Sequence, residues 1–326
     1  MRRRRSEFAA ALALGALLLC VVSEGLHAQV EGAGPLELVF PFGARAVGMG
    51  QAVIAVPIGT DAIWWNPGGL ATLRRSEVVL QHLTRQDLYQ ANGFTVAVPR
   101  PPVGVVAISA QLVDYGQQDV TDSTNVLTGH SSLRFLTGVA TFATTFGARV
   151  AAGVSYKVFQ RRSDCSGFCP GNSGNSAVSY AVDAGVQYRI SDSLPLTIGA
   201  VVRNLGLRLQ QKDEAQADLI PTRLHIGASY APRLPVTMKG AELTASAEVV
   251  RSPNFDETGV RVGAEVGWLG QFFGRAGYSH GAGPSGGSVG LGFVSGRIKI
   301  DLARSLGSQN ETLGGAPTLL SLRVGL

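Results

Sequence analysis

The sequence predicts an all-β fold, a transmembrane antiparallel up-and-down β-barrel of about 14 strands. Hydrophobic residues make up 45% of the 326 residues and charged residues only 16%, which excludes a disordered, highly charged chain. Beyond Val22 no apolar run approaches the roughly 20 residues that a transmembrane helix requires. From Ser76 onward apolar and polar residues instead alternate, as they do in strands that have one apolar and one polar face.

The N-terminus has the pattern of a secretory signal peptide. Four basic residues, Arg2–Arg5, precede the apolar run Phe8–Val22, and the small residue Ala28 offers a cleavage site. Cys20 is a weaker candidate for lipidation, because its neighbours are large apolar residues. We therefore expect residues 1–28 to direct export to the bacterial outer membrane and to be removed.

Charge and cysteine content limit the partners and cofactors. The formal net charge of the chain is only +5, and this charge is spread along the sequence. We therefore expect no nucleic-acid partner. No His lies between residues 131 and 224, so Cys165 and Cys169 lack further metal ligands, and an exported protein can oxidise such a pair. The sequence predicts a local disulfide, with no metal site and no cofactor.

Alternating segments and the connections between them define the barrel. Most segments are close to the 9–11 residues that suit a tilted membrane strand. The connections after even-numbered segments are short, as in the periplasmic turns of outer-membrane barrels, whereas several after odd-numbered segments are long and polar. The long ones are 116–131, 161–176, 205–221 and 305–316. The predicted strands are 76–84, 89–98, 103–115, 132–145, 148–160, 177–190, 195–204, 222–231, 238–250, 257–268, 271–279, 286–295, 297–304 and 317–326.

Aromatic residues lie beside the short connections, where a barrel has an interfacial girdle. They are Phe146, Tyr188, Tyr230, Trp268 and Phe272.

Charged residues that alternate with the lipid-facing ones are expected to line the lumen. An unpaired Arg or Lys at the bilayer midplane would cost about 2–4 kcal/mol, whereas residues of both signs inside the barrel can pair with one another. We expect a self-paired lining rather than a substrate path. The predicted lumen residues are Arg149, Lys157, Asp183, Arg189, Arg203, Arg223, Glu242, Glu248, Arg261, Glu265, Arg275, Lys299, Asp301 and Arg323.

The segment before the first strand, residues 29–75, lacks the alternation and carries the most specific motifs. It contains PFGARAVGMGQAVIAV, starting at Pro41, and DAIWWNPGGLA, starting at Asp61. Small residues at 43–52 permit close backbone packing, as in a segment threaded inside a barrel. Asn66-Pro67-Gly68 indicates a turn, and the two adjacent Trp residues provide a large anchor.

These two runs closely resemble the amino-terminal signature of the PorV/PorQ family of outer-membrane proteins. That family is related to the FadL-type barrels, which carry a comparable NPAGL motif; Gly68 stands where the usual motif has Ala, and Leu326 where a terminal aromatic residue is common. The resemblance implies a 14-stranded barrel with an N-terminal hatch, so we expect the signal peptide (1–28) to be followed by a hatch (29–75) and a barrel (76–326). The hatch motif comprises Gly43, Arg45, Gly48, Gly50, Asp61, Trp65, Asn66, Pro67, Gly69 and Leu70.

Two functions remain open. The PorV/PorQ resemblance implies a barrel that assists type IX secretion or the surface delivery of exported proteins, with secretion components or cargo proteins as partners besides the membrane lipid. The long outer loops favour this role. The alternative is a FadL-like channel for hydrophobic small molecules such as long-chain fatty acids. Enzyme activity is not expected, because His82, His130, His225 and His280 show no catalytic spacing and no GxSxG motif is present.

Overall fold

The structure is a computed structural model in which residue 38 and residues 40–85, 88–169, 174–191, 193–206, 209, 219–235, 238–253, 256–283, 285–307 and 316–326 are described. The predicted signal peptide lies outside these residues, as do residues 29–37 of the predicted hatch.

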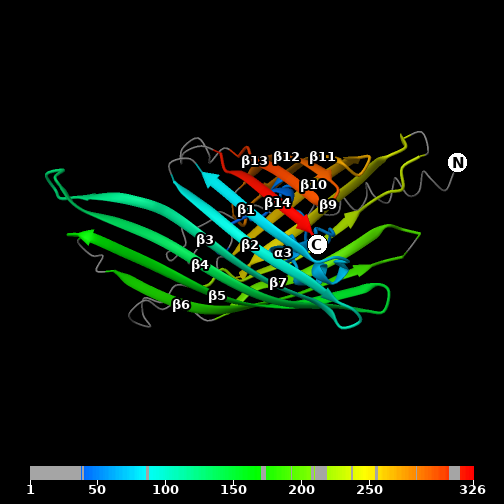
Figure 1. Ribbon diagram of the computed structural model, residues 1–326, viewed down its shortest axis with the longest axis horizontal. Helices are drawn as coiled ribbons and strands as arrows, with labels where there is room; N and C mark the ends of the chain where they lie inside the picture. Colours follow the sequence, from blue (N-terminus) through cyan, green and yellow to red (C-terminus); the bar gives the residue numbers. More distant parts are fainter. Residues whose placement is uncertain are drawn as a thin grey trace. The chain divides into compact units, whose positions relative to one another are not determined.

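Fourteen strands of the described part of the chain close into a barrel, which confirms the predicted fold class (Figure 1). Each strand pairs antiparallel with its neighbours in sequence, and the pairing of β1 with β14 closes the ring. Closure satisfies the backbone hydrogen bonds of every strand without an exposed edge. The strands are β1 (Glu77–Arg85), β2 (Tyr89–Arg100), β3 (Gly104–Thr121), β4 (Leu127–Phe146), β5 (Val150–Gly167), β6 (Asn175–Arg189), β7 (Leu196–Gly206), β8 (Arg223–Tyr230), β9 (Ala241–Ser252), β10 (Glu257–Trp268), β11 (Phe272–His280), β12 (Gly286–Ser295), β13 (Ile298–Ser305) and β14 (Thr318–Gly325).

Alternation along each strand separates an inner from an outer face. In β6, Ser179, Ala181 and Asp183 are buried, whereas Tyr180 and Val182 between them are exposed. The same period of two places apolar side chains on the outer face of the other strands. No helix of the described residues is long and apolar enough to cross a membrane.

The outer face also carries exposed aromatic residues close to the short connections. Phe146, Trp268 and Phe272 are exposed at the ends of β4, β10 and β11, as the aromatic girdle predicts, and Tyr188 is exposed on β6. Tyr230, at the end of β8, is partly buried. We call the end with the connections after even-numbered strands the turn end, and the opposite end the loop end.

The turn end has tight connections, as predicted. Between β10 and β11, Leu269 and Gly270 both have positive φ, 56° and 64°. Two consecutive residues with positive φ form the backbone of a type I′ turn, which matches the twist of paired strands. Gly270 supplies this conformation without a Cβ penalty.

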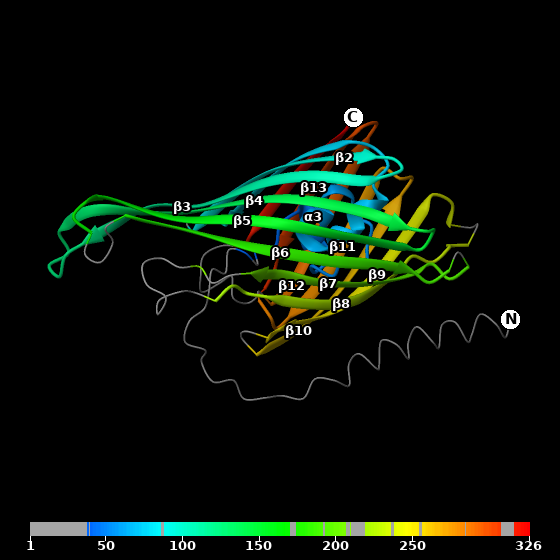
Figure 2. The same ribbon diagram turned by 90° about the horizontal axis from the view of Figure 1, so that it is seen from below.

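The loop end differs from the prediction at two of its four long connections. The predicted loops 116–131 and 161–176 are mostly strand, because β3, β4 and β5 run on to Thr121, from Leu127 and to Gly167. Figure 2 shows these strands projecting past their neighbours. Residues 116–121 are mostly polar and mostly exposed, so this part of β3 has no buried face to produce the alternation from which strands were predicted.

A five-residue connection, residues 122–126, replaces the first of these loops. Asp122 Oδ1 accepts hydrogen bonds from the Thr124 amide (2.8 Å), the Thr124 hydroxyl (2.6 Å) and the Val126 amide (3.0 Å). The bond from the Thr124 hydroxyl and those from the amides hold the pKa of the Asp122 carboxyl below its ordinary value. At the tip of the next hairpin, a disulfide joins Cys165 and Cys169.

The segment before β1 fills the inside of the barrel (Figure 2). It contains the short helices α2 (Ala44–Gly48), η2 (Gly59–Asp61), α3 (Ala62–Trp65) and η3 (Pro67–Thr72). Almost all of its residues from Phe42 to Leu70 are buried. We keep the name hatch for the described part of the segment, residues 40–75.

Candidate functional site

Glycines on the inner wall let the backbone of the hatch approach the strands. A Cβ added to Gly277 would lie 2.1 Å from the amide nitrogen of Gly50, and one added to Gly263 would lie 2.1 Å from the carbonyl oxygen of Met49. On the hatch, Gly50 has φ +61°, and its own added Cβ would lie 2.5 Å from the amide nitrogen of Tyr278. Similar close approaches occur at Gly93, Gly153, Gly185 and Gly199.

The predicted turn motif packs in this way against β5 and β6. Asn66 caps η3 by accepting a hydrogen bond from the Gly68 amide (3.1 Å). Its Nδ2 donates to the carbonyl oxygens of Ile54 (2.8 Å) and Val186 (3.1 Å), so one side chain ties two parts of the hatch to the wall. An added Cβ on Gly185 would lie 2.1 Å from Asn66 Oδ1. The motif therefore requires a wall without side chains at this point.

The remaining predicted hatch residues also lie at the interface with the wall. Pro67 lies over Gly153, and an added Cβ on Gly48 would lie 3.1 Å from the Cα of Gly290. Gly69 packs on the amide of Gln187, and Leu70 is fully buried.

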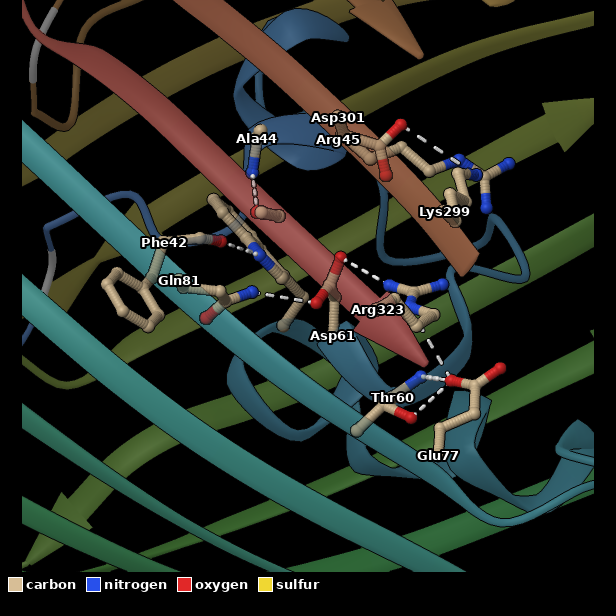
Figure 3. Close-up of polar contacts among 12 residues, drawn as sticks. Phe42, Ala44, Arg45, Thr60, Asp61, Glu77, Gln81, Lys299, Asp301 and Arg323 are labelled. Atoms are coloured by element: carbon tan, nitrogen blue, oxygen red, sulfur yellow. Dashed lines mark hydrogen bonds and ion pairs between the residues drawn. The ribbon is translucent and has the colours of Figure 1, made fainter. Parts of the chain in front are cut away.

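Asp61 fastens the hatch to the seam between β1 and β14 (Figure 3). Its carboxylate accepts hydrogen bonds from Arg323 (2.8 Å) and Gln81 (2.8 Å), while Thr60 bonds through its amide to Glu77 (3.2 Å). The two sides of this seam thus hold the same turn of the hatch, η2.

Arg45 fastens the hatch to the neighbouring part of the wall, at β10. Its guanidinium donates to both carboxylate oxygens of Glu265, at 2.6 and 2.9 Å. Arg275 bonds to the same carboxylate at 2.5 Å and lies 2.8 Å from Asp301, which is 3.9 Å from Lys299. Bidentate Arg–carboxylate contacts of this kind fix orientation as well as distance.

A third polar group holds the middle of the hatch. Glu248 Oε2 accepts the amides of Val53 (3.1 Å) and Ile54 (3.3 Å), and Oε1 lies 3.2 Å from Arg261 and 3.1 Å from His225. The hatch thus supplies some of the partners of the charged wall residues, alongside the predicted partners across the lumen.

The structure places most of the predicted lumen residues inside the barrel. Lys299 is half-buried. For three others the prediction is wrong. Arg149, Arg189 and Glu242 are exposed at the turn end, because they lie at the limits of their strands, beyond the part of the wall that the hatch covers. The buried ones are Lys157, Asp183, Arg203, Arg223, Glu248, Arg261, Glu265, Arg275, Asp301 and Arg323.

A small pocket lies between the hatch and the inner faces of β3, β4, β5 and β7. Aromatic side chains of the hatch form one side, and the guanidinium carbon of Arg203 lies 5.3 Å from the ring centre of Trp65. Lys157 pairs there with Asp183 at 2.6 Å. The lining residues are Leu38, Phe40, Phe42, Trp64, Trp65, Gln111, Thr137, Lys157 and Arg203.

A row of aromatic rings runs from this pocket across β2, β3 and β4. Phe40 stacks on Tyr89 with ring centres 4.8 Å apart, Tyr89 is 5.5 Å from Tyr115, and Tyr115 is 6.1 Å from Phe135. Arg161 lies 5.9 Å above the Phe135 ring. This row is not among the residues predicted from the sequence. Its signal was present, since Tyr115 and Phe135 are large aromatic residues at inward positions of strands whose inner face is otherwise largely small or polar.

Comparison with solved structures shows that this fold has known counterparts. The Ralstonia pickettii toluene transporter TbuX matches with a TM-score of 0.57 at 13% identity, over 87% of this chain and 98% of that one. The monoaromatic hydrocarbon channel CymD matches with a TM-score of 0.59 at 13% identity, over 87% of this chain and 97% of that one.

A Pseudomonas aeruginosa FadL homologue matches with a TM-score of 0.51 at 12% identity, over 90% of this chain and 99% of that one. No protein-family model and no curated protein sequence matches the chain. At these identities the likeness shows a shared fold. The predicted FadL-like barrel fold is thereby confirmed, and nothing in these comparisons supports the PorV/PorQ family in particular.

Proposed function

We propose that the chain is an outer-membrane channel for hydrophobic small molecules, which corresponds to the FadL-like alternative. The observation that carries the proposal is the aromatic surface that the hatch presents at the pocket, with Phe40, Phe42, Trp64 and Trp65 in its lining. Binding sites for small apolar ligands are concave, and aromatic and apolar side chains form most of their lining.

The aromatic row supports the same function. Phe40, Tyr89, Tyr115 and Phe135 form a row of rings that crosses β2, β3 and β4 beside the pocket. A hydrophobic molecule that reaches the hatch from the loop end can therefore contact aromatic rings of the wall as well as those of the hatch. The solved structures with the same fold include transporters of toluene and channels for monoaromatic hydrocarbons.

The secretion role loses part of its support. Two of the long loops that favoured docking of cargo, 116–131 and 161–176, are instead mostly paired strands. An N-terminal signal peptide and localisation to the outer membrane remain part of the proposal.

Tryptophan fluorescence provides a direct test of binding. The chain has three Trp residues, and Trp268 is exposed on the outer face, so Trp268→Phe leaves Trp64 and Trp65 as reporters in the pocket. We expect toluene to quench this variant saturably in detergent micelles. Expression in cells that lack their own hydrocarbon channels should raise toluene uptake. Loss of surface proteins on deletion of the gene, with unchanged uptake of hydrophobic compounds, would refute the channel and restore the secretion role.

A further inference from the structure

A groove of about 470 Å³ crosses the outer face of the barrel over β4 to β8, and its lining is almost entirely apolar. The small residues Ala152, Ala184 and Ala200 line it on three adjacent strands. Two larger side chains of β4, Phe142 and Phe146, line it at one end. Neighbouring strands lie about 4.8 Å apart, so a groove across five strands is about 19 Å long. Since one bilayer leaflet has about 15 Å of hydrocarbon, the groove is long enough for a lipid acyl chain.

The groove reaches the turn end at β4. Phe146 is the last residue of β4, and Arg149 follows it in the connection to β5. Arg189, at the end of β6, donates from its guanidinium to the carbonyl oxygen of Ala148 in the same connection (2.6 Å). Both arginines are exposed. This end of the groove therefore lies beside two cationic side chains.

The turn end as a whole carries an excess of positive charge. In the described part of the turn end Glu242 is the only exposed acidic residue, and the sequence of the connections adds Asp192. At the loop end an exposed cation such as Arg134 has its own carboxylate partner, Asp114, at 3.2 Å. No carboxylate of the described residues forms an ion pair with Arg149. The exposed basic residues of the turn end are Arg74, Arg75, Arg100, Arg149, Arg189, Arg233, Lys239 and Arg297.

We propose that the groove and the arginines at its turn end bind an anionic phospholipid, with an acyl chain in the groove and the phosphate at Arg149 and Arg189. The planar guanidinium of arginine matches the oxygens of a phosphate and keeps its charge. Phe146 and Tyr188 are exposed nearby on the outer face, and such rings lie at the level of lipid headgroups. A neutral lipid would fill the groove but leave the positive charge of the turn end unbalanced. The proposal depends on the place of the barrel in a membrane and not on the channel function.

Native mass spectrometry of the protein in detergent micelles tests the proposal with phosphatidylglycerol and phosphatidylcholine of identical acyl chains, which differ in net charge. A basic residue near an anionic lipid contributes about fivefold to binding, so with two arginines we expect phosphatidylglycerol to bind at least about tenfold tighter. Arg149→Gln should weaken phosphatidylglycerol about fivefold and leave phosphatidylcholine unchanged. Arg304→Gln removes the same charge from an exposed position at the loop end, and it should bind both lipids as the unmodified protein does.

A second pair of variants tests the groove without a change in charge. Ala184→Phe places a ring in the groove and should weaken both lipids, whereas Ala110→Phe adds the same ring to the exposed outer face of β3, outside the groove, and should weaken neither. Equal affinity of the unmodified protein for the two lipids would overturn the proposal, as would equal losses for Arg149→Gln and Arg304→Gln. Unchanged lipid binding by Ala184→Phe would overturn it too. Toluene binding should be the same in all four variants, so a failure of this proposal can be told apart from a failure of the channel function.

Discussion

The fit between the hatch and the inner wall can be tested by adding one methyl group. In Gly277→Ala, the new Cβ would lie 2.1 Å from the amide nitrogen of Gly50 and 2.3 Å from the carbonyl carbon of Met49. Carbon atoms in contact are about 3.5 Å apart, so the hatch would have to move by roughly 1.4 Å. The obstructing atoms are backbone, which cannot rotate away. Overpacking typically costs about 1–3 kcal/mol, and we expect the upper end of this range.

The matched control lies on the same strand. An added Cβ on Gly274 meets nothing within 4 Å, so Gly274→Ala should be neutral or more stable by about 0.4–1 kcal/mol, because alanine restricts the unfolded chain. Urea titration of the protein folded in lipid vesicles measures the free energy of unfolding of each variant. Planar-bilayer conductance reports whether the hatch still closes the barrel, and we expect it to rise only for Gly277→Ala. Equal stability and conductance of the two variants would refute the tight fit.

Two further predictions concern polar contacts of the hatch and of the loop end. Arg323→Met leaves the carboxylate of Asp61 buried without its counter-ion, so urea titration should show a loss of about 3–5 kcal/mol, whereas the exposed Arg304→Met should change stability by less than about 0.5 kcal/mol. A smaller effect of the first variant would show that the seam does not hold the hatch. The lowered pKa of Asp122 means that its charged form stabilises the turn above pH 3.8, and that this support is lost as the pH falls further toward the folded-state pKa. Asp122→Ala should therefore speed hydrogen exchange of the Thr124 amide at neutral pH, with a difference that shrinks on acidification; a difference independent of pH would contradict the role of the carboxylate.

Much of the barrel could be predicted from the sequence, because a strand between lipid and lumen has a strict period of two. The predicted strand 257–268 matches β10, and 286–295 matches β12. The pattern fails where both faces of a strand meet a similar environment. Residues 116–121 of β3 are mostly polar and mostly exposed, and the sequence therefore predicts a loop there.

The hatch contacts were less accessible to sequence reasoning. A family resemblance pointed to Asp61 and Asn66, but not to their partners, because Asp61 and Arg323 are separated by 262 positions. Periodicity identified which charges face inward without showing which are paired. The inward aromatic rings of the strands could have been predicted, because they interrupt a pattern of small and polar residues on the inner face.

The buried charges hold the hatch to the wall to unequal degrees. Glu248 and Glu265 each hold two parts of the structure together, so their burial is compensated by several hydrogen bonds. Arg203 has a cation–π contact with Trp65 instead, which is worth about 0.5–2 kcal/mol. The carboxylates of Asp183 and Glu248 attract its guanidinium as well, but each of them has a closer cationic partner. We therefore expect the two glutamates to contribute more to the attachment of the hatch than Arg203 does.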